Sequence, residues 1–237
     1  MTKLILALNV EDAQQALGLL GEIGNQVDFY KIGIDLWAKT GPGLIKEFVS
    51  QGAKVFLDLK FADIPSVVAK AVAAVTELGV KMLTVHAMGG AEMLYAANKA
   101  AKETAEMKGV EKPVVLGVTV LTSLDRAGLT QITGCSQEVE TRVLALAELA
   151  QSMGCDGVVA SPMEIRQIKK RCGSRFIVVT PGIRLGGARL GDDQQRVMTP
   201  AQAAEAGADY IVVGRPIYEA PDPLAAIREI RERLGGK

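Results

Sequence analysis

The sequence predicts a single α/β domain over residues 1–237, a (β/α)8 TIM barrel, and two observations lead to this fold class. Short runs rich in β-branched residues alternate eight times with longer segments of helical period. Repeated β-α units imply parallel strands joined by right-handed crossovers, and eight units fit a closed barrel better than an open sheet. The GxGxxG fingerprint of open dinucleotide-binding sheets is also missing after the first strand, where residues 7–11 read ALNVE.

Each element has local support along the chain. Apolar, β-branched clusters place the strands at residues 4–8, 27–32, 53–59, 81–85, 113–118, 157–160, 176–179 and 210–213. Apolar residues at helical spacing place the helices at residues 11–23, 44–50, 64–78, 91–108, 137–153, 163–171, 199–206 and 223–234. Several helices end at a glycine that suits a left-handed cap: Gly52, Gly79, Gly109 and Gly207. No Pro/Ser-rich linker divides the chain, so one domain is expected.

Composition excludes several classes of protein. Hydrophobic residues make up 49% of the 237 residues, which is typical of a globular protein with a large core. Lys+Arg and Asp+Glu both total 27, and aromatic residues are only 4%, so we expect no nucleic-acid partner. We also expect no membrane partner, because no apolar run is long enough to cross a bilayer. Three widely spaced cysteines and the lack of a signal-peptide cleavage site favour the cytoplasm.

Charged residues gather where two strands end, and barrel enzymes carry their chemistry at such ends. Lys31 lies at the end of the second predicted strand, Asp58 and Lys60 lie around the end of the third, and Asp63 follows on the next loop. Residues two apart on a strand share a face, so Asp58 and Lys60 are expected to point into the barrel mouth if the intervening leucines pack outward. Burying charged side chains is costly, so we interpret Lys31, Asp58, Lys60 and Asp63 as a charge array that acts in catalysis. The alternative is a structural salt-bridge network at the barrel rim.

The last two strands are followed by residues suited to phosphate. Residues 180–184 read TPGIR and residues 214–217 read GRPI. Many barrels bind a phosphate between these two loops, where glycine lets backbone N–H groups approach and arginine offers a bidentate fork. We therefore predict a phosphate site at Arg184, Gly214 and Arg215; the alternative is turn glycines and solvated arginines. The glycine-containing stretch 185–198 is long enough to be a mobile lid that grips the phosphate.

Two other features leave alternatives open. His86, the only histidine, follows the fourth strand; it is either a general base or, as we favour, a hydrogen-bonded rim residue. Thr119, Thr122 and Ser123 follow the fifth strand and either bind a polar ring or turn the chain.

These motifs together resemble the orotidine 5′-phosphate decarboxylase family along nearly the whole chain. Residues 58–65 read DLKFADIP and resemble the DLKxxDIP signature. The resemblance extends over residues 31–33 (KIG), 85–90 (VHAMGG), 118–123 (VTVLTS), 180–184 (TPGIR), 193–200 (DQQRVMTP) and 213–215 (VGR). DxKxxD alone is shared with sugar-phosphate enzymes on the same barrel, whereas its combination with LTS, PGIR and DQxRVxTP is more specific.

The resemblance implies cofactor-free decarboxylation of orotidine 5′-monophosphate to uridine 5′-monophosphate, the last step of de novo UMP synthesis, without a metal. It implies that Lys60 protonates C6, that Asp58 lies near the departing carboxylate, and that Lys31 and Asp63 hold the array. It also implies a homodimer in which Asp63 reaches the partner's active site. The substrate-binding residues implied are Asn9, Lys31, Asp58, Thr122, Ser123, Arg184, Gln194, Gly214 and Arg215.

The sequence departs from the family pattern at three positions and leaves two other functions open. Asn9 replaces the usual aspartate, Ala62 a histidine and Val67 a threonine, so ribose contacts and one cross-subunit contact are affected rather than the charge array. The enzyme alternative is a sugar-phosphate decarboxylase or hexulose-phosphate synthase with Mg²⁺ and an enediolate intermediate. The non-enzyme alternative is a nucleotide-binding barrel that lost its activity.

Overall fold

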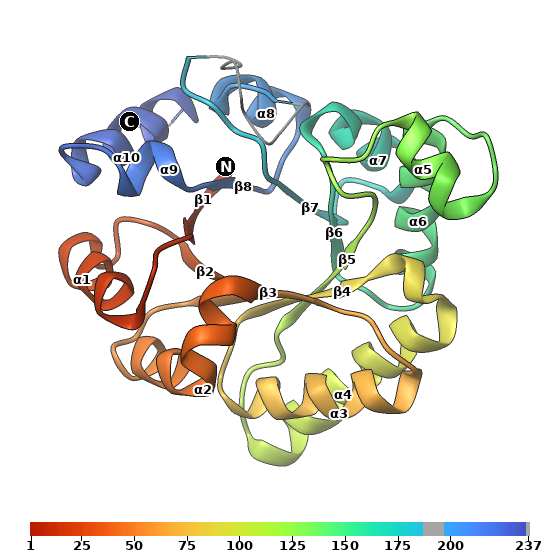
Figure 1. Ribbon diagram of the computed structural model, residues 1–237, viewed down its shortest axis with the longest axis horizontal. Coiled ribbons are helices and arrows are strands. Elements are labelled where there is room, and N and C mark those ends of the chain that lie inside the picture. The colour runs from red at the N-terminus through yellow and green to blue at the C-terminus, as the bar shows by residue number, and fades with distance from the viewer. Residues whose placement is uncertain (187–196, 236–237) are drawn as a thin grey trace.

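The protein is a closed barrel of eight parallel strands surrounded by helices (Figure 1). The computed structural model describes residues 1–186 and 197–235. The strands pair in chain order and β1 closes on β8: β1 (Lys3–Leu8), β2 (Phe29–Gly33), β3 (Val55–Phe61), β4 (Met82–His86), β5 (Val114–Val118), β6 (Gly157–Val159), β7 (Ile177–Thr180) and β8 (Tyr210–Val213). The predicted (β/α)8 fold class is therefore confirmed.

Helices cover the outside of this barrel. They are α1 (Ala13–Ile23), α2 (Ile34–Ser50), α3 (Pro65–Glu77), α4 (Ala91–Lys108), α5 (Arg126–Thr133), α6 (Val139–Ser152), α7 (Ile165–Cys172), α8 (Pro200–Ala206), α9 (Arg215–Tyr218) and α10 (Pro223–Arg233), with short 3-10 turns η1 (Ala87–Gly89) and η2 (Pro162–Glu164). In the described part of the chain, no helix is both long and apolar enough to span a membrane.

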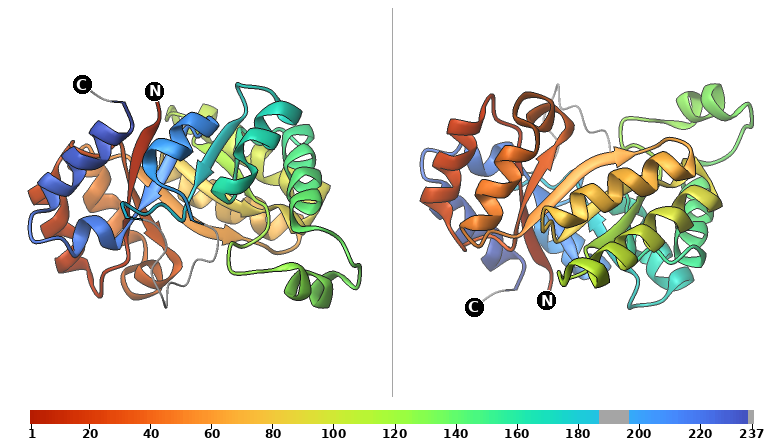
Figure 2. Two further views of the ribbon diagram at one scale, coloured as in Figure 1. Left: turned by 90° about the horizontal axis from the view of Figure 1, so that it is seen from above. Right: turned by 90° about the horizontal axis from the view of Figure 1, so that it is seen from below.

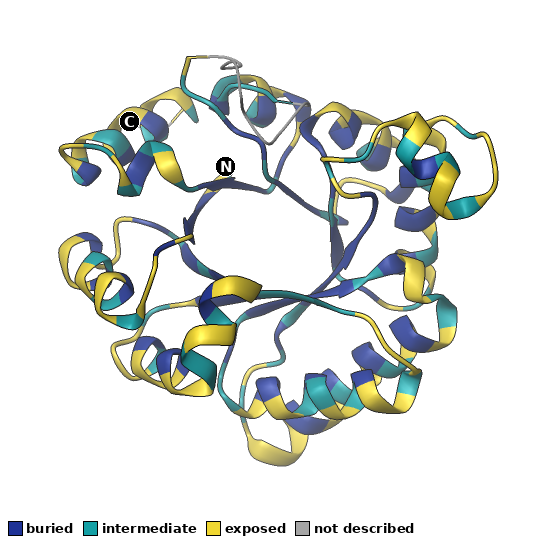
Figure 3. Ribbon diagram, in the orientation of Figure 1, coloured by how far each residue is buried: buried dark blue, intermediate teal, exposed yellow. Residues whose placement is uncertain are grey.

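Alternation along the strands divides the apolar residues into two cores. In β1, Leu4, Leu6 and Leu8 pack against the helices, whereas Ile5 and Ala7 point into the barrel. The interior cluster is small and includes Phe29, Phe56, Met82, Leu116, Val179, Tyr210 and Val212. Colouring by burial shows a buried ring of strands inside helices whose outer faces are exposed (Figure 3). The barrel interior is thus a packed base on which polar residues at the strand ends can be mounted.

Local sequence explains where many helices begin and end. The Asp12 carboxylate accepts a hydrogen bond from the Gln15 N–H at 2.9 Å and so caps α1, and Asp222 caps α10 in the same way. At the other end, Gly109 terminates α4 in the left-handed conformation that glycine adopts without strain.

Three helical segments were not expected from the sequence. α2 begins at Ile34 rather than at residue 44, because it is two helices joined at a kink where Gly41 has φ 60° and Pro42 follows. The short helix α9 follows β8 directly, and α5 lies in the connection after β5. Figure 2 shows α5 standing away from the body of the barrel, which explains why it has few core positions to create a strong apolar pattern.

Candidate active site

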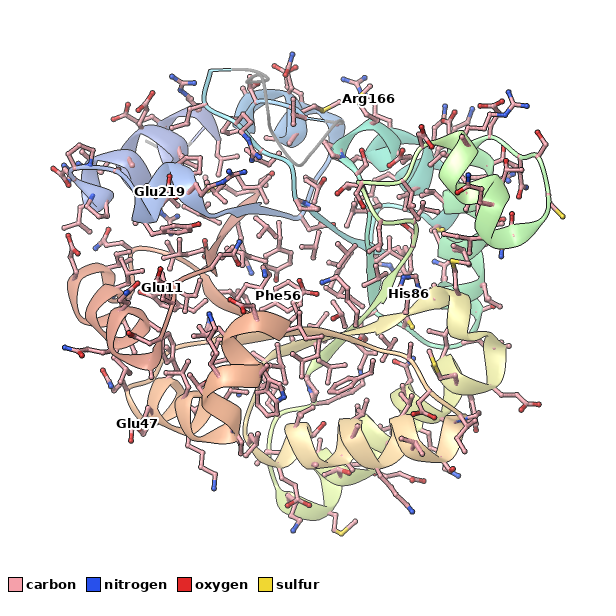
Figure 4. The ribbon with its side chains drawn as sticks, viewed as in Figure 1. Glu11, Glu47, Phe56, His86, Arg166 and Glu219 are labelled. Carbon is pink, nitrogen blue, oxygen red and sulfur yellow. The ribbon has the colours of Figure 1, made fainter. Side chains whose placement is uncertain are left out.

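A cavity of about 470 Å³ opens at the C-terminal ends of the strands, which is a volume suited to a small-molecule ligand. Its apolar base includes Ala7, Phe56 and Val212, which belong to the barrel interior. Figure 4 shows Phe56 near the barrel centre. Its walls carry polar residues from β2, β3 and the connection after β1 on one side, and from the connections after β5, β7 and β8 on the other.

Three of the four predicted array residues meet in this cavity. Nζ of Lys60 lies 2.9 Å from Oδ2 of Asp58, and Nζ of Lys31 lies 3.4 Å from the same oxygen. The side chains of Lys31 and Asp58 are 12% and 13% exposed, whereas that of Lys60 is 36% exposed. One carboxylate oxygen therefore holds two ammonium groups, both of which line the cavity, and Lys60 is the more accessible of the two.

The neighbouring charges keep Asp58 ionised despite its burial. Burial alone would raise the pKa of Asp58, but the positive charges of Lys31 and Lys60, with hydrogen bonds from Lys60 and Thr84, hold this pKa below its usual value. The pKa of Lys31 is lowered, chiefly by burial and also by the charge of Lys60, although Asp58 opposes the shift. The lowered pKa of Asp58 favours its anionic form at neutral pH.

The backbone of Lys60 is unusual. With φ 52°, it is the single non-glycine residue in the left-handed region among the described residues. Such a conformation costs an L-residue about 1–2 kcal/mol. Asp58 and Lys60 were expected to share a face through simple alternation; they do meet, but through a distorted strand end. Leu57 and Leu59 nevertheless pack on the outer side, as expected.

The phosphate residues predicted from the sequence lie on the opposite wall. Arg184, Gly214 and Arg215 all line the cavity, and Arg215 begins α9. The Arg184 N–H donates to the Met198 carbonyl at 3.0 Å, so the two ends of the 185–198 stretch are joined next to the cavity. Gln194, like most of that predicted lid, lies outside the described residues.

The remaining predicted contacts are distributed around the rim. Asn9 and Thr122 line the cavity, whereas Ser123 is exposed and is not among the described lining residues. Asp63 is also exposed, away from the lining, and its Oδ1 accepts a hydrogen bond from the Ile64 N–H at 2.6 Å. Within one chain, Asp63 is therefore not brought to the array.

His86 behaves as the rim residue that we favoured. Its Nδ1 accepts a hydrogen bond from the Met88 N–H at 3.4 Å, just after β4, and Figure 4 shows it at that edge of the barrel. Burial, and secondarily the charge of Lys60, lower the pKa of His86, which favours the neutral ring.

Sequence reasoning missed Tyr218, which lines the cavity from the last residue of α9. Burial, and secondarily the charge of Glu219, raise the pKa of Tyr218. Residues three apart share a helix face, so Tyr218 lies on the same face of α9 as Arg215. A prediction of this helix from the sequence would therefore have placed Tyr218 at the cavity.

Known proteins resemble this chain along nearly its whole length. Residues 2–230 match the model of the orotidine 5′-phosphate decarboxylase / HUMPS family. The orotidine 5′-phosphate decarboxylase of Moorella thermoacetica is 48% identical over 232 residues, which cover 98% of this chain and 92% of that protein. That of Legionella pneumophila is 47% identical over 232 residues, covering 98% of this chain and 99% of that protein.

Solved structures agree with these sequence relationships. The crystal structure of orotidine 5′-phosphate decarboxylase from Lactobacillus acidophilus has a TM-score of 0.87 to this chain at 35% identity, covering 100% of both chains. The enzyme from Pyrococcus horikoshii has a TM-score of 0.75 at 25% identity, covering 99% of this chain and 100% of that one. The charge array and the loops that carry Arg184 and Arg215 face one cavity. Because the family match and these relatives cover nearly the whole chain, this chain belongs to the orotidine 5′-phosphate decarboxylase family.

Proposed function

We propose that this chain decarboxylates orotidine 5′-monophosphate to uridine 5′-monophosphate, the last step of de novo pyrimidine synthesis. The observation that carries the proposal is the placement of Lys31, Asp58 and Lys60 on one wall of the cavity that Arg184 and Arg215 line on the other. A nucleotide fits this arrangement, with its phosphate at the arginines and its base at the charge array.

In the proposed reaction, the bond between C6 and the carboxylate breaks, CO₂ leaves, and the electron pair remains on C6. The Lys60 ammonium stabilises the developing negative charge and then gives its proton to C6. Asp58 holds that ammonium at 2.9 Å, so no reorganisation is needed when the charge forms. Each 1.4 kcal/mol of preferential transition-state stabilisation is worth about tenfold in rate. These residues require no metal or cofactor for the step.

The other predicted residues bind the remote parts of the nucleotide. Arg184 and Arg215, with the Gly214 backbone, hold the phosphate, and Gln194 links it to the base. Thr122 and Ser123 contact the pyrimidine, and Asn9 and Lys31 contact the ribose. Binding energy at the phosphate is then available to order the charge array at the other end of the substrate.

We further propose a cytoplasmic homodimer in which Asp63 enters the partner's site. Exposed apolar side chains follow the ends of β2 to β5 in succession: Ile34, Ile64, Val67, Met88 and Leu121. Because these strands are neighbours, their connections form one face beside the cavity, and an exposed apolar face of this kind favours association. Asp63 lies on this face, next to Ile64.

The first test is loss of orotidine 5′-monophosphate absorbance with and without EDTA. EDTA-insensitive turnover by the wild type that disappears in Lys60→Ala would support the reaction and its proton donor. Turnover only of a sugar phosphate with Mg²⁺ would favour the enediolate alternative. Binding of uridine 5′-monophosphate without any turnover would favour the nucleotide-binding alternative.

The shared site is tested by mixing two inactive variants, Lys60→Ala and Asp63→Asn. If Asp63 serves the partner's site, random exchange makes about half of the dimers mixed, each with one intact site, so about a quarter of wild-type activity returns. If Asp63 serves its own site, every site in the mixture lacks one residue and no activity returns. Sedimentation of the same mixture measures the oligomeric state.

A further inference from the structure

The pairing of β3 with β4 is irregular at the charge array. Leu57 pairs with Leu83, but the next pair is Phe61 with Val85. Four steps along β3 therefore match two steps along β4, and three residues, Asp58 to Lys60, face the single residue Thr84. Such a bulge disrupts the regular ladder and leaves backbone groups of the longer strand without their usual partners.

The Thr84 hydroxyl fills this gap. It accepts a hydrogen bond from the Lys60 backbone N–H at 2.9 Å and donates one to Oδ1 of Asp58 at 3.0 Å. The directions are fixed, because an N–H only donates and an ionised carboxylate only accepts. The hydroxyl thus replaces a strand carbonyl as the partner of the N–H of Lys60, the residue with φ 52°.

These contacts link Thr84, Asp58 and Lys60 to one another. Thr84 holds Oδ1 of Asp58, while Oδ2 of the same carboxylate lies 2.9 Å from Nζ of Lys60. Thr84 is 0% exposed and is not among the described residues that line the cavity. It therefore reaches both the backbone of Lys60 and the carboxylate that orients its ammonium, without a surface on which substrate could bind.

We infer that Thr84 is a positioning residue for the decarboxylation, an inference that rests on the proposed function. Its hydroxyl fixes the backbone conformation of Lys60 and the rotation of the Asp58 carboxylate at the same time. Without it, the Lys60 ammonium samples positions from which it neither stabilises charge at C6 nor delivers the proton. Since substrate binding does not use Thr84, the effect falls on kcat rather than on KM.

Thr84→Val removes the hydroxyl and keeps the branched shape. We expect kcat to fall about 10- to 100-fold, the range for loss of a hydrogen bond to a charged group, with KM changed by less than about threefold. Thr84→Ser keeps the hydroxyl and should retain kcat within about threefold of the wild type. The matched control is Thr76→Val, the same substitution at another fully buried threonine, whose hydroxyl donates to the Val72 carbonyl within α3 at 2.8 Å. It should leave kcat unchanged.

Several results with these variants would contradict the positioning role of Thr84. Wild-type kcat in Thr84→Val, or an equal loss of kcat in Thr84→Ser, would overturn the role of the hydroxyl. A rise in KM with unchanged kcat would also overturn it, since that result indicates substrate binding. If Thr84→Val does not fold, Thr84→Ser and Thr84→Ala differ only in the hydroxyl and give the same comparison. Absence of turnover in the wild type would instead contradict the proposed function itself.

Discussion

Gly33 leaves the space that the Lys31 ammonium occupies: a Cβ atom built on Gly33 would lie 3.3 Å from Nζ of Lys31. The backbone of Gly33 is extended, with φ −89° and ψ 177°, a conformation that any residue adopts. A side chain at this position would therefore act through space and not through backbone conformation. Because Lys31 reaches Asp58 at 3.4 Å, crowding of its ammonium disturbs the whole array.

Gly33→Ala should lower kcat/KM by roughly fivefold, equivalent to about 1 kcal/mol of lost transition-state stabilisation. The control is Gly21→Ala on α1, where no atom lies within 4 Å of the added Cβ. That variant should keep wild-type kcat/KM and gain up to about 1 kcal/mol of stability from helix propensity. Steady-state kinetics and urea unfolding of both variants check the expectation. Wild-type kinetics in Gly33→Ala would show that Lys31 has room to move.

The left-handed backbone of Lys60 makes glycine preferable to alanine at this position. Lys60→Gly should exceed Lys60→Ala in free energy of unfolding by about 0.5–1 kcal/mol, because relief of strain outweighs the greater freedom of the unfolded glycine chain. Both variants lack the ammonium and should be inactive. At Lys70, within α3, the order should reverse, with alanine more stable by about 1 kcal/mol. Urea unfolding of the four variants measures both differences, and the same order at both positions would contradict the strain.

Asp58→Asn removes the one carboxylate between two ammonium groups. At neutral pH it should destabilise the fold by about 2–4 kcal/mol, because Lys31 and Lys60 then repel without compensation. Asp35→Asn, which breaks an exposed pair with Lys39, should cost less than about 1 kcal/mol. Unfolding free energies measured at pH 7 compare the two, and equal values would show that the array contributes no net stability.

The same substitution tests the pKa of Asp58. A carboxyl whose folded pKa lies below its ordinary value of 3.8 contributes stability that is present above that value and is lost as the pH falls through it into the lowered range. The stability advantage of wild type over Asp58→Asn should therefore shrink below about pH 4, by up to about 1.4 kcal/mol per pH unit. Urea unfolding between pH 3 and pH 6 measures it; a constant advantage would mean that the pKa of Asp58 is not lowered.

Substitution of Arg215 tests whether the phosphate binds on the wall of the cavity that Arg184 and Arg215 line. Arg215→Ala should reduce kcat/KM about 10- to 100-fold, the value of a hydrogen bond between charged groups, with little change in stability because the side chain is exposed. Arg228→Ala, in an exposed pair with Asp222, is the control and should leave kinetics unchanged. Near-normal kcat/KM in Arg215→Ala would remove this residue from phosphate binding.

The barrel and most of the cavity could be predicted because both follow from regular repeats. Strand alternation brings Lys31 and Asp58 to the same end of the barrel. The fold places Arg184 and Arg215 on the loops after the last two strands, where many barrels bind a phosphate. The α2 kink at Gly41 and the bulge before Lys60 could not be predicted, because each is an interruption of the period on which the prediction depends. Asp63 faces outward in a single chain, so its role depends on a second chain that periodicity does not describe.

The distribution of charge around the cavity has a consequence for how fast a ligand arrives. The described lining residues carry four cationic side chains, those of Lys31, Lys60, Arg184 and Arg215, against the one carboxylate of Asp58, in a chain whose formal net charge is +0. An approaching anionic nucleotide is therefore drawn toward the mouth of the cavity by a local field rather than by the protein's total charge. Salt screens such a field over about 10 Å at 0.1 M. The rate of ligand association should therefore fall as ionic strength rises, although the net charge of the whole protein alone would predict no such dependence.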